Sequence, residues 1–445
     1  MLNRLNITID GRVFQAEQST NLLRFLRGQG FAISASCNGS GTCGKCAVEL
    51  DGETQLACEV TLTRDCAVKL PVRRQMQITD DYLPAPERAE PRAGFGLAID
   101  LGTTTVAMEL IDLSSGESVM KAGFENPQRA FGADVISRIS ASKEHANELQ
   151  RLICEAISAQ AEGLLQAVAV QADQVIGVVI SGNTTMIYLL LGYDCACLGV
   201  HPFEPGTALQ NPYAWGILFG GAIACPVFVV PWVSAFVGGD IVSALLHAPK
   251  TSAFSPAFLS AFLLVDLGTN GEIALRHASG LLCTATAAGP AFEGMKTNLY
   301  GSELLDLTAQ MLREGTIDET GLLLEENGPL TQKDIREIQL AKSAVRTGIE
   351  LLMKLAGQPE LDAVYLCGGF GKALNPQSAA EIGLLPEALR TKTIALGNAS
   401  LGGAAQLLRA PGARQEIEKI LAAQTVNLAA QPEFNEYFME YLGFE

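Results

Sequence analysis

Apolar and polar residues alternate in two short segments near the N-terminus, 5–10 and 13–16. Such alternation is typical of half-buried β-strands, and the Asp10-Gly11 step between the segments is a strong signal for a tight hairpin. In residues 21–27 (NLLRFLR) the apolar side chains recur at helical spacing instead. We therefore predict a short helix there, capped at its start by Thr20.

Two further apolar segments, one on each side of the turn Asp51-Gly52, complete the pattern of the N-terminal region. Strands that surround a single helix in this order predict a β-grasp domain over residues 1–75. The next segment, 76–94, has three prolines after Leu83 and no apolar period. That composition predicts a linker, which lets the small domain move relative to the rest of the chain.

From residue 95 onward, apolar strand-like segments alternate with helical patterns. Three consecutive strands are predicted in a meander, followed by an amphipathic helix between 149 and 164 and a buried strand. A second series begins near residue 261 and includes a predicted helix at 341–356. The predicted strands are 95–100, 105–112, 118–124, 174–181, 261–275 (as a hairpin) and 363–369.

The phrase Asp-Leu-Gly-Thr ends the first strand of each series, at Asp100–Thr103 and at Asp266–Thr269. A repeat at this distance is too long for a solenoid and predicts two duplicated halves within an α/β domain. We place these halves at about 95–255 and 256–445, so that the domain spans residues 95–445.

Composition narrows the class of protein further. A chain of 445 residues is expected to hold more than one domain, and 48% apolar with 18% charged residues fits a packed α/β protein. The net charge of −17 argues against nucleic acid and anionic membrane surfaces as partners. We find no apolar run long enough to cross a membrane and no signal-peptide pattern, so we expect a cytoplasmic protein with reduced thiols.

Four cysteines stand close together near the N-terminus, with glycines between the first three. Five residues separate the first two, two separate the next pair, and eleven precede the fourth: Cys37, Cys43, Cys46 and Cys58. A tight glycine-rich loop with three ligands and a fourth from a neighbouring segment is typical of a [2Fe–2S] ferredoxin. A structural zinc site is the main alternative, although it usually has two Cys-x2-Cys pairs. Unrelated cysteines are the remaining interpretation.

Each Asp-Leu-Gly-Thr phrase turns directly into another strand, which predicts a hairpin whose tip binds phosphate. Gly102 and Gly268 permit the turn and a close approach of the backbone to the ligand. Donors to phosphate oxygens follow each glycine: Thr103, Thr104, Thr269 and Asn270. Asp100 and Asp266 would repel phosphate, so we expect each to hold Mg²⁺ through water. Two matching hairpins predict a triphosphate held between two half-domains.

With CGGFGKAL at 367–374, the two hairpins resemble the actin/sugar-kinase/Hsp70 superfamily of ATPases, which have a ribonuclease H-like fold. Together with the N-terminal cysteines, longer phrases resemble the ATP-dependent reductive activators of corrinoid enzymes. These phrases are ENPQRAFGADVISRI (125–139), ISGNTTMIYLLLG (180–192), VPWVSAFVGGD (230–240), AAGPAFEGMK (287–296) and LAKSAVRTGIELL (340–352).

The resemblance implies that the protein passes an electron from a [2Fe–2S] cluster to Co(II) in a corrinoid protein of a methyltransferase system. An upstream electron donor reduces the cluster, and ATP drives the uphill step. The four cysteines then hold the cluster, and the two hairpins bind ATP. Implied adenosine contacts are Gly368, Gly369, Gly371, Glu293 and Lys296, while Gly182–Thr184 and Gly239–Asp240 line the same cleft.

The chain departs from the resemblance in one respect that concerns assembly. Many such activators have a middle domain associated with dimer formation, and here the linker leads almost directly into the first ATPase strand. The sequence therefore favours neither a monomer nor a dimer.

Two other ATP-dependent functions compete. A small-molecule kinase of the same superfamily would use Asp266 or Glu272 as a base, but it has no need of a cluster. An activator of radical dehydratases would need a cysteine pair within the ATPase domain, and Cys195 and Cys197 lie too close together in sequence. We therefore predict an enzyme that couples ATP hydrolysis to electron transfer.

Overall fold

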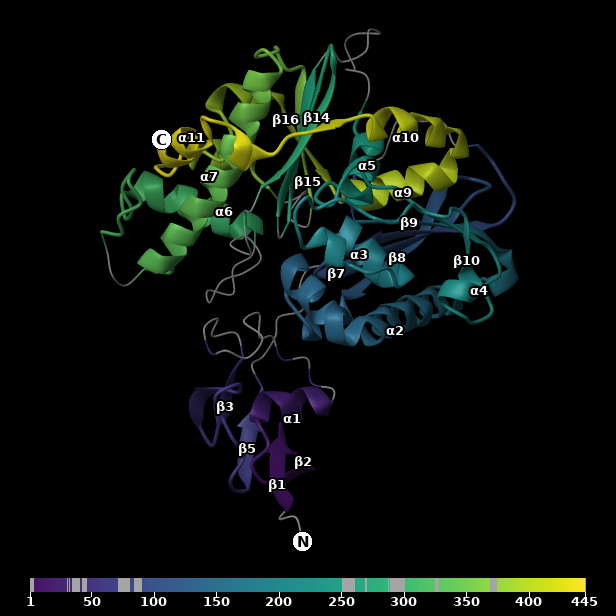
Figure 1. Cartoon of the computed structure of the whole chain (residues 1–445), viewed down its shortest axis with the longest axis vertical. Coiled ribbons are helices and arrows are strands. Elements are labelled where there is room, and N and C mark those ends of the chain that lie inside the picture. Colours follow the sequence, from purple (N-terminus) through teal and green to yellow (C-terminus); the bar gives the residue numbers. More distant parts are fainter. Residues whose placement is uncertain are drawn as a thin grey trace.

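The computed structural model describes 4–29, 31, 33, 41, 46–70, 81–83, 90–249, 261–268, 270–286, 288, 301–324, 328–368 and 374–444. In these residues the chain forms three mixed β-sheets, one of five strands and two of six. Figure 1 shows the five-stranded sheet in its own small N-terminal body and the two six-stranded sheets in a larger body with helices around them.

The small sheet has the order β2-β1-β5-β3-β4 and packs one helix. Its first two strands form the predicted hairpin at Asp10-Gly11, and β5 runs parallel to β1 across the middle. This is the predicted β-grasp order. Its elements are β1 (Arg4–Ile9), β2 (Arg12–Glu17), α1 (Leu22–Gly28), β3 (Ala47–Leu50), β4 (Glu53–Leu56) and β5 (Cys66–Lys69).

One detail of this unit differs from the prediction. The N-cap of α1 is Asn21 rather than Thr20, because the Asn21 side chain accepts a hydrogen bond from the amide of Arg24. Both residue types are good N-caps, so the pattern alone did not separate two neighbouring candidates.

The first half of the larger body has the sheet order β10-β11-β9-β6-β7-β8. Strands β6, β7 and β8 form the predicted antiparallel meander, and β9 lies parallel to β6. Its main elements are β6 (Phe95–Leu101), β7 (Thr105–Asp112), β8 (Glu117–Glu125), α2 (Val135–Ala167), β9 (Val175–Gly182), α3 (Thr184–Leu191), β10 (Tyr213–Ala214), α4 (Trp215–Leu218), β11 (Pro226–Val229) and α5 (Gly239–His247).

The second half has the order β16-β15-β12-β13-β14-β17. Helix α7 begins at Gln332, well before the predicted start at 341, because Thr331 and Asp334 form a capping box that the apolar period did not reveal. The elements are β12 (Phe262–Leu267), β13 (Gly271–His277), β14 (Gly280–Thr286), α6 (Gly301–Glu314), α7 (Gln332–Leu355), β15 (Ala363–Cys367), α8 (Pro376–Glu381), β16 (Thr393–Gly397), α9 (Ala399–Arg409), α10 (Arg414–Leu421), β17 (Gln424–Thr425) and α11 (Phe434–Glu440).

Five strands of each large sheet share one topology, and the sixth strand lies at opposite ends, β10 beside β11 and β17 beside β14. In each, a three-strand meander is extended by two parallel strands on the side of its first strand. In each, a helix follows the outer parallel strand: α5 in the first half and α9 in the second. The repeated phrase therefore marks a duplicated fold.

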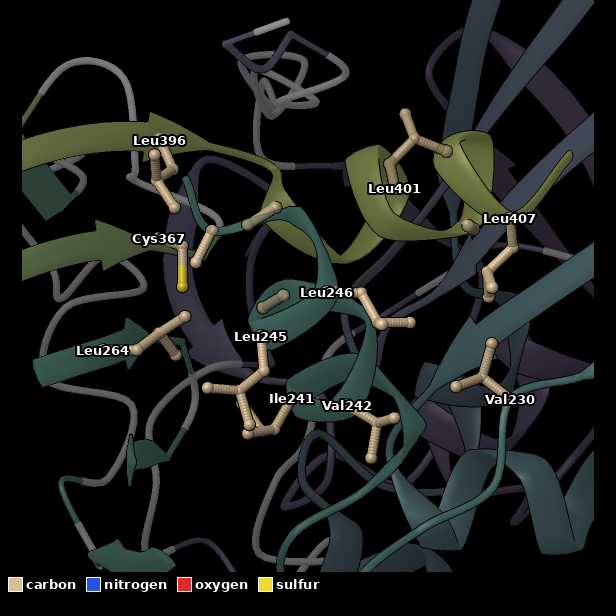
Figure 2. Close-up of a cluster of buried hydrophobic side chains, with 14 of the residues drawn as sticks. Val230, Ile241, Val242, Leu245, Leu246, Leu264, Cys367, Leu396, Leu401 and Leu407 are labelled. Atoms are coloured by element: carbon tan, nitrogen blue, oxygen red, sulfur yellow. The ribbon is translucent and has the colours of Figure 1, made fainter. Parts of the chain in front are cut away.

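Helices α5 and α9 pack against each other between the two sheets, in an apolar core to which both halves contribute. Figure 2 shows side chains of both helices in this core, among them Leu245 and Leu246 of α5 and Leu401 of α9. The helices approach closely at Gly403, where an added Cβ would lie 2.0 Å from the carbonyl oxygen of Ser243. Helix α9 also contacts β6, β7 and β9, so an element of the second half covers the first sheet.

The C-terminal segment, in which the sequence showed no interpretable motif, folds onto α7. Three buried polar side chains of α7 donate hydrogen bonds to backbone carbonyls of the C-terminal segment: Gln339 to Leu442, Lys342 to Gly443 and Ser343 to Phe438. The phrase at 340–352 thus includes residues that hold the end of the chain. Within the described ranges, none of the helices has the length and apolar character needed to cross a membrane.

Candidate electron-transfer and nucleotide sites

Two of the four predicted cluster ligands lie within the described residues, and the fold brings them together. The Sγ atoms of Cys46 and Cys58 are 3.3 Å apart, well beyond the length of a disulfide bond. Two thiolates about 2.3 Å from one tetrahedral metal ion lie about 3.8 Å apart, which is close to this spacing. The pair therefore fits a shared metal ion. Cys37 and Cys43 lie outside the described residues, so their part in the site stays a prediction.

The segment that carries Cys58 is held by the start of α1. The Asn21 side chain donates hydrogen bonds to the carbonyl oxygens of Cys58 (2.8 Å) and Val60 (3.3 Å), and the amide of Ala57 donates to Cys46 (3.0 Å). Cys46 is almost completely buried. These hydrogen bonds hold the segment that carries Cys58 next to Cys46.

The first phosphate hairpin lies between β6 and β7. The amide of Gly102 donates to the carbonyl of Thr105 (3.0 Å), and a Cβ at Gly102 would lie 2.6 Å from that oxygen. Only glycine fits this turn. The Thr103 hydroxyl accepts a hydrogen bond from Asn183 (2.9 Å), the N-cap of α3, and Thr104 is buried beside it.

Two buried side chains from the phrase at 125–139 hold this hairpin from below. Asn126 donates to the carbonyl oxygen of Gly102 (2.9 Å), and Arg138 donates to the carbonyl oxygen of Thr103. Both side chains are at most 1% exposed. Both hydrogen bonds go to backbone carbonyl groups, so the two side chains fix the shape of the hairpin.

Asp100, the acidic residue of the first hairpin, is held by the second half of the domain. Its two carboxylate oxygens accept hydrogen bonds from Asn398 (2.9 Å) and Ser400 (2.6 Å), at the N-terminus of α9. The Ser400 hydroxyl also lies 2.9 Å from that of Ser181 on β9. Burial raises the pKa of Asp100, and the two hydrogen bonds oppose that shift.

The second hairpin lies at the equivalent place, between β12 and β13, but its turn is one residue shorter: Leu101 pairs with Val106 in the first hairpin, whereas Leu267 pairs with Gly271 in the second. The amide of Gly268 donates to the carbonyl of Asn270 (2.9 Å), which closes the turn. Asp266 contacts the thiol of Cys367 at 3.4 Å, and Gly368 follows directly at the end of β15. With φ at +102° and an added Cβ 2.4 Å from the carbonyl of Leu267, Gly368 admits no other residue without strain.

Asp266 faces other carboxylates. Burial is the main cause that raises the pKa of Asp266 to about 6, with a contribution from Asp100. Burial and the charge of Asp266 raise the pKa of Asp240, at the N-terminus of α5, to about 8. Burial, Asp240 and Asp266 raise the pKa of Glu272 on β13 well above its ordinary value. We call Asp240, Asp266 and Glu272 the carboxylate group.

A bound cation suits the carboxylate group, because it would offset the cost of several negative charges in one partly buried place. Within the described residues, no three acidic, histidine or cysteine side chains lie close enough to hold a metal ion directly. Mg²⁺ held through water by these carboxylates therefore stays a prediction.

The structure brings most of the described candidates to one place, the carboxyl ends of β6, β9, β12 and β15. Five of the predicted nucleotide contacts lie outside the described residues and stay predictions: Thr269, Glu293, Lys296, Gly369 and Gly371. Sequence reasoning missed Asn126, Arg138, Asn398 and Ser400. The first two lie in a phrase that was noted, but Asn398 and Ser400 had no signal because they come from the opposite half.

Family models match the ferredoxin unit and both halves of the larger body. A family model described as a 2Fe-2S iron-sulfur cluster binding domain matches residues 6–65. The model described as the RACo middle region matches residues 95–249, and the C-terminal domain of RACo, the ASKHA domain, matches 260–299 and 325–445. The middle region, which the sequence led us to expect to be missing, is therefore matched: it corresponds to the first large sheet and its helices, directly after the linker.

Individual proteins are similar over most of the chain. The corrinoid activation enzyme RamQ of Eubacterium limosum is 27% identical, covering 81% of this chain and 71% of its own. The [Co(II) methylated amine-specific corrinoid protein] reductase of Methanosarcina barkeri is 21% identical, with 79% and 77% covered. The solved structure of a reductive activator for corrinoid, iron-sulfur protein shares the fold, with a TM-score of 0.69, 24% identity, and 99% and 98% covered. Two models of one family together match more than half of the sequence, and so the chain belongs to the RACo family.

Proposed function

We propose that this protein reactivates a corrinoid protein by ATP-dependent transfer of one electron to its Co(II), which becomes Co(I). The observation that carries the proposal is one chain with two sites: a thiol pair spaced for one metal ion and a duplicated phosphate hairpin. Relatives whose names state corrinoid activation or Co(II) corrinoid reduction match it over most of its length.

The ferredoxin unit supplies the electron. An upstream reductant, which the sequence does not identify, donates one electron to the [2Fe–2S] cluster, and the cluster passes it to the cobalt. Cys46 and Cys58 hold one side of the cluster, and we keep Cys37 and Cys43 as its other ligands. The Asn21 brace keeps the Cys58 segment in place, which limits reorganisation when the charge of the site changes.

The two hairpins bind ATP. We assign Thr103 and Thr104 on one side and Asn270 on the other to donate to phosphate oxygens, while Gly102 and Gly268 close the two turns. Mg²⁺, when bound, neutralises phosphate charge and polarises the terminal phosphoryl group. We assign Asp266, Asp240 and Glu272 to hold it through water, with Glu272 or Asp266 placed to orient the attacking water. Asp100 instead joins the halves, since Asn398 and Ser400 occupy both of its oxygens.

The uphill electron transfer needs a link between ATP and the acceptor. ATP bound between two halves that meet through Asp100, α5 and α9 favours one arrangement of those halves over another. That arrangement presents the surface that binds the corrinoid protein, and ATP hydrolysis returns the two halves to the other arrangement. We propose a cytoplasmic location, and the proposal applies to a monomer as well as to a dimer.

The cluster assignment is tested by visible absorption and metal content. We expect anaerobically purified protein to show the spectrum of a [2Fe–2S] centre and Cys46→Ala to lose it. Cys66→Ala is the matched control, because Cys66 lies on β5 of the same unit and is not a predicted ligand. A colourless protein with stoichiometric zinc would contradict the redox function.

The coupling is tested with a Co(II) corrinoid protein and a chemical reductant. We expect Co(I) to form only when ATP and Mg²⁺ are present, and the absorption of Co(I) measures its formation. Reduction at the same rate without ATP would show that the ATPase unit has another role.

A further inference from the structure

The segment that leaves the ferredoxin unit is attached to the ATPase unit at residues 81–83. The amide of Leu83 donates to the carbonyl of Leu396 (3.0 Å), and the amide of Asn398 donates to that of Asp81 (3.0 Å). Tyr82 thereby forms an antiparallel bridge with Gly397. Gly397 has φ of +78°, and a Cβ there would lie 2.3 Å from the carbonyl oxygen of Asp81. The end of β16 is thus shaped to accept this segment.

The Tyr82 side chain is 8% exposed and lies in a polar pocket. Its hydroxyl donates to Oε2 of Glu109 (2.6 Å) and accepts from Nη1 of Arg409 (2.9 Å), while Nη2 of that arginine donates to Oε1 of the same glutamate (2.8 Å). The Lys121 ammonium lies 4.3 Å from the ring centroid, and the His247 ring packs edge-on at 5.1 Å. These partners come from β7, α9, β8 and α5, so the pocket belongs to both halves.

Glu109 requires a hydrogen-bond donor at the position of the Tyr82 hydroxyl. The carboxylate is fully buried on β7, and a buried charge is stable only when its oxygens accept hydrogen bonds. Tyr82 and Arg409 provide one such bond each to its two oxygens. Burial and the charge of Glu109 raise the pKa of Tyr82, which keeps the hydroxyl protonated as a donor.

The chain is attached again at Glu90 and Arg92, whose amides donate to the carbonyls of Arg409 and Leu113 at 2.8 Å each. The contact at Tyr82 therefore decides how much chain is available to the ferredoxin unit. Ten residues separate Leu70 from Asp81, and nineteen separate it from Glu90. At about 3.3–3.6 Å per residue, the first length reaches at most about 40 Å and the second about 70 Å.

One residue links this attachment to the nucleotide site. The backbone amide of Asn398 holds Asp81, while its side chain donates to Asp100 in the first phosphate hairpin. Glu109 lies on β7, the strand that leaves the same hairpin. A shift of the β16–α9 junction toward or away from Asp100 therefore moves the surface on which residues 81–83 lie.

We propose that Tyr82 is a positioning residue for the electron transfer: it anchors the tether of the ferredoxin unit at the junction of the two ATPase halves, where the nucleotide state is sensed. The anchor sets the reach of the cluster and ties it to the element that binds Asp100. This inference rests on the proposed function for its effect on electron transfer, but the anchor itself is a property of the structure.

The anchor is tested by hydrogen–deuterium exchange of the full-length holoprotein, with and without Mg²⁺ and a non-hydrolysable ATP analogue. In the wild type we expect protection in peptides containing Leu83 and Asn398, with a change on adding the analogue. Tyr82→Ala should raise exchange in both peptides at least tenfold, and Tyr82→Phe, which keeps the ring but not the hydroxyl, should have a smaller effect in the same direction. Leu83→Ala is the matched control, since that side chain is 37% exposed and its backbone makes the contact.

The consequence for function is tested by single-turnover reduction of a Co(II) corrinoid protein. Without the Tyr82 contact, the tether lengthens from ten to nineteen residues. The effective concentration of the cluster at the cobalt then falls by about 2.6-fold, so Tyr82→Ala should slow cobalt reduction about threefold. Cluster absorption and ATP hydrolysis should stay unchanged. Wild-type exchange in Tyr82→Ala, or wild-type cobalt reduction despite a released segment, would overturn the inference. A wild-type protein that reduces no corrinoid protein would instead overturn the proposed function, and the exchange result would still decide whether Tyr82 is the anchor.

Discussion

The two phosphate hairpins lie at equivalent places, between the first two strands of each meander, and have opposite electrostatics. In the first, Asp100 accepts hydrogen bonds from Asn398 and Ser400, which are neutral donors at the start of α9. In the second, Asp266 faces Asp240 at the start of α5 and Glu272 on β13, and all three carboxyl pKa values are raised. Each aspartate thus meets the helix of the opposite half, but one meets donors and the other meets acids.

This difference shows how a duplicated fold divides one task. Equivalent elements supply both environments, so the topology does not decide which aspartate binds a cation. The residues at two helix starts decide it. Where that start carries Asn and Ser, the aspartate becomes part of the contact between halves. Where it carries a further aspartate, a site is left that a cation stabilises.

The largest expected effect comes from exchanging the two aspartates for amides. We expect Asp266→Asn to lower ATP-dependent cobalt reduction on the order of a hundredfold, because the carboxylate group then holds Mg²⁺ poorly. Cluster absorption should remain. Asp100→Asn is the matched variant, and its main effect should be a lower melting temperature, since it weakens the contact to α9.

Equal losses of activity and equal melting temperatures in the two variants would remove the distinction between the hairpins. Activity should be compared at saturating ATP and Mg²⁺, so that a lower affinity is separated from a lower rate.

The next effect concerns the helix pair that brings the two aspartates into place. Gly403→Ala should destabilise the protein by about 3 kcal/mol, because the added methyl group meets the Ser243 carbonyl and forces α5 and α9 apart. Gly163→Ala, on the exposed side of α2, has nothing within 4 Å and should be neutral or stabilising by about 0.5–1 kcal/mol. Denaturant unfolding measures both, and a Gly403→Ala protein as stable as the wild type would contradict this packing.

A smaller loss is expected at the donor to Asp100. Ser400→Ala leaves one oxygen of a buried carboxylate without its hydroxyl partner, which costs roughly 1–3 kcal/mol. Ser400→Thr keeps the hydroxyl and serves as the control for loss of the hydrogen bond. Unfolding free energies that fall equally in both variants would point to packing rather than to the bond.

The acidic side of the comparison predicts a pH dependence with a definite sign. Asp240 has its pKa raised to about 8, so the folded protein holds a proton that the unfolded chain has lost above about pH 4. Stability of the metal-free protein should therefore fall as pH rises from about 5 to 8, with Asp240 contributing up to about 1 kcal/mol per pH unit. Asp240→Asn should flatten this slope and leave the stability at pH 5 nearly unchanged. Melting temperatures across this range decide the point, and an unchanged slope would exclude a buried, protonated Asp240.

Much of the fold followed from local pattern. The first meander, the β-grasp order and the repeated Asp-Leu-Gly-Thr phrase are visible because period and turn residues report on neighbours along the chain. Thr20 against Asn21, and the early start of α7, show the limit of that information: caps depend on side-chain contacts that several nearby residues are equally able to make. The role of Arg138 was also hidden, since a charged residue in a helix looks exposed until a buried carbonyl is known to face it.

The sequence by itself determined the chemistry: which residues are able to bind iron or phosphate, and that the phosphate hairpin occurs twice. Only the tertiary structure decided which partners those residues meet. Asp100 meets Asn398 and Ser400 some three hundred residues away, and Tyr82 meets Glu109 and Arg409 across both halves. The physical reason is that hydrogen bonds and burial act over a few ångströms in space, whereas pattern along the chain reports only on residues a few positions apart.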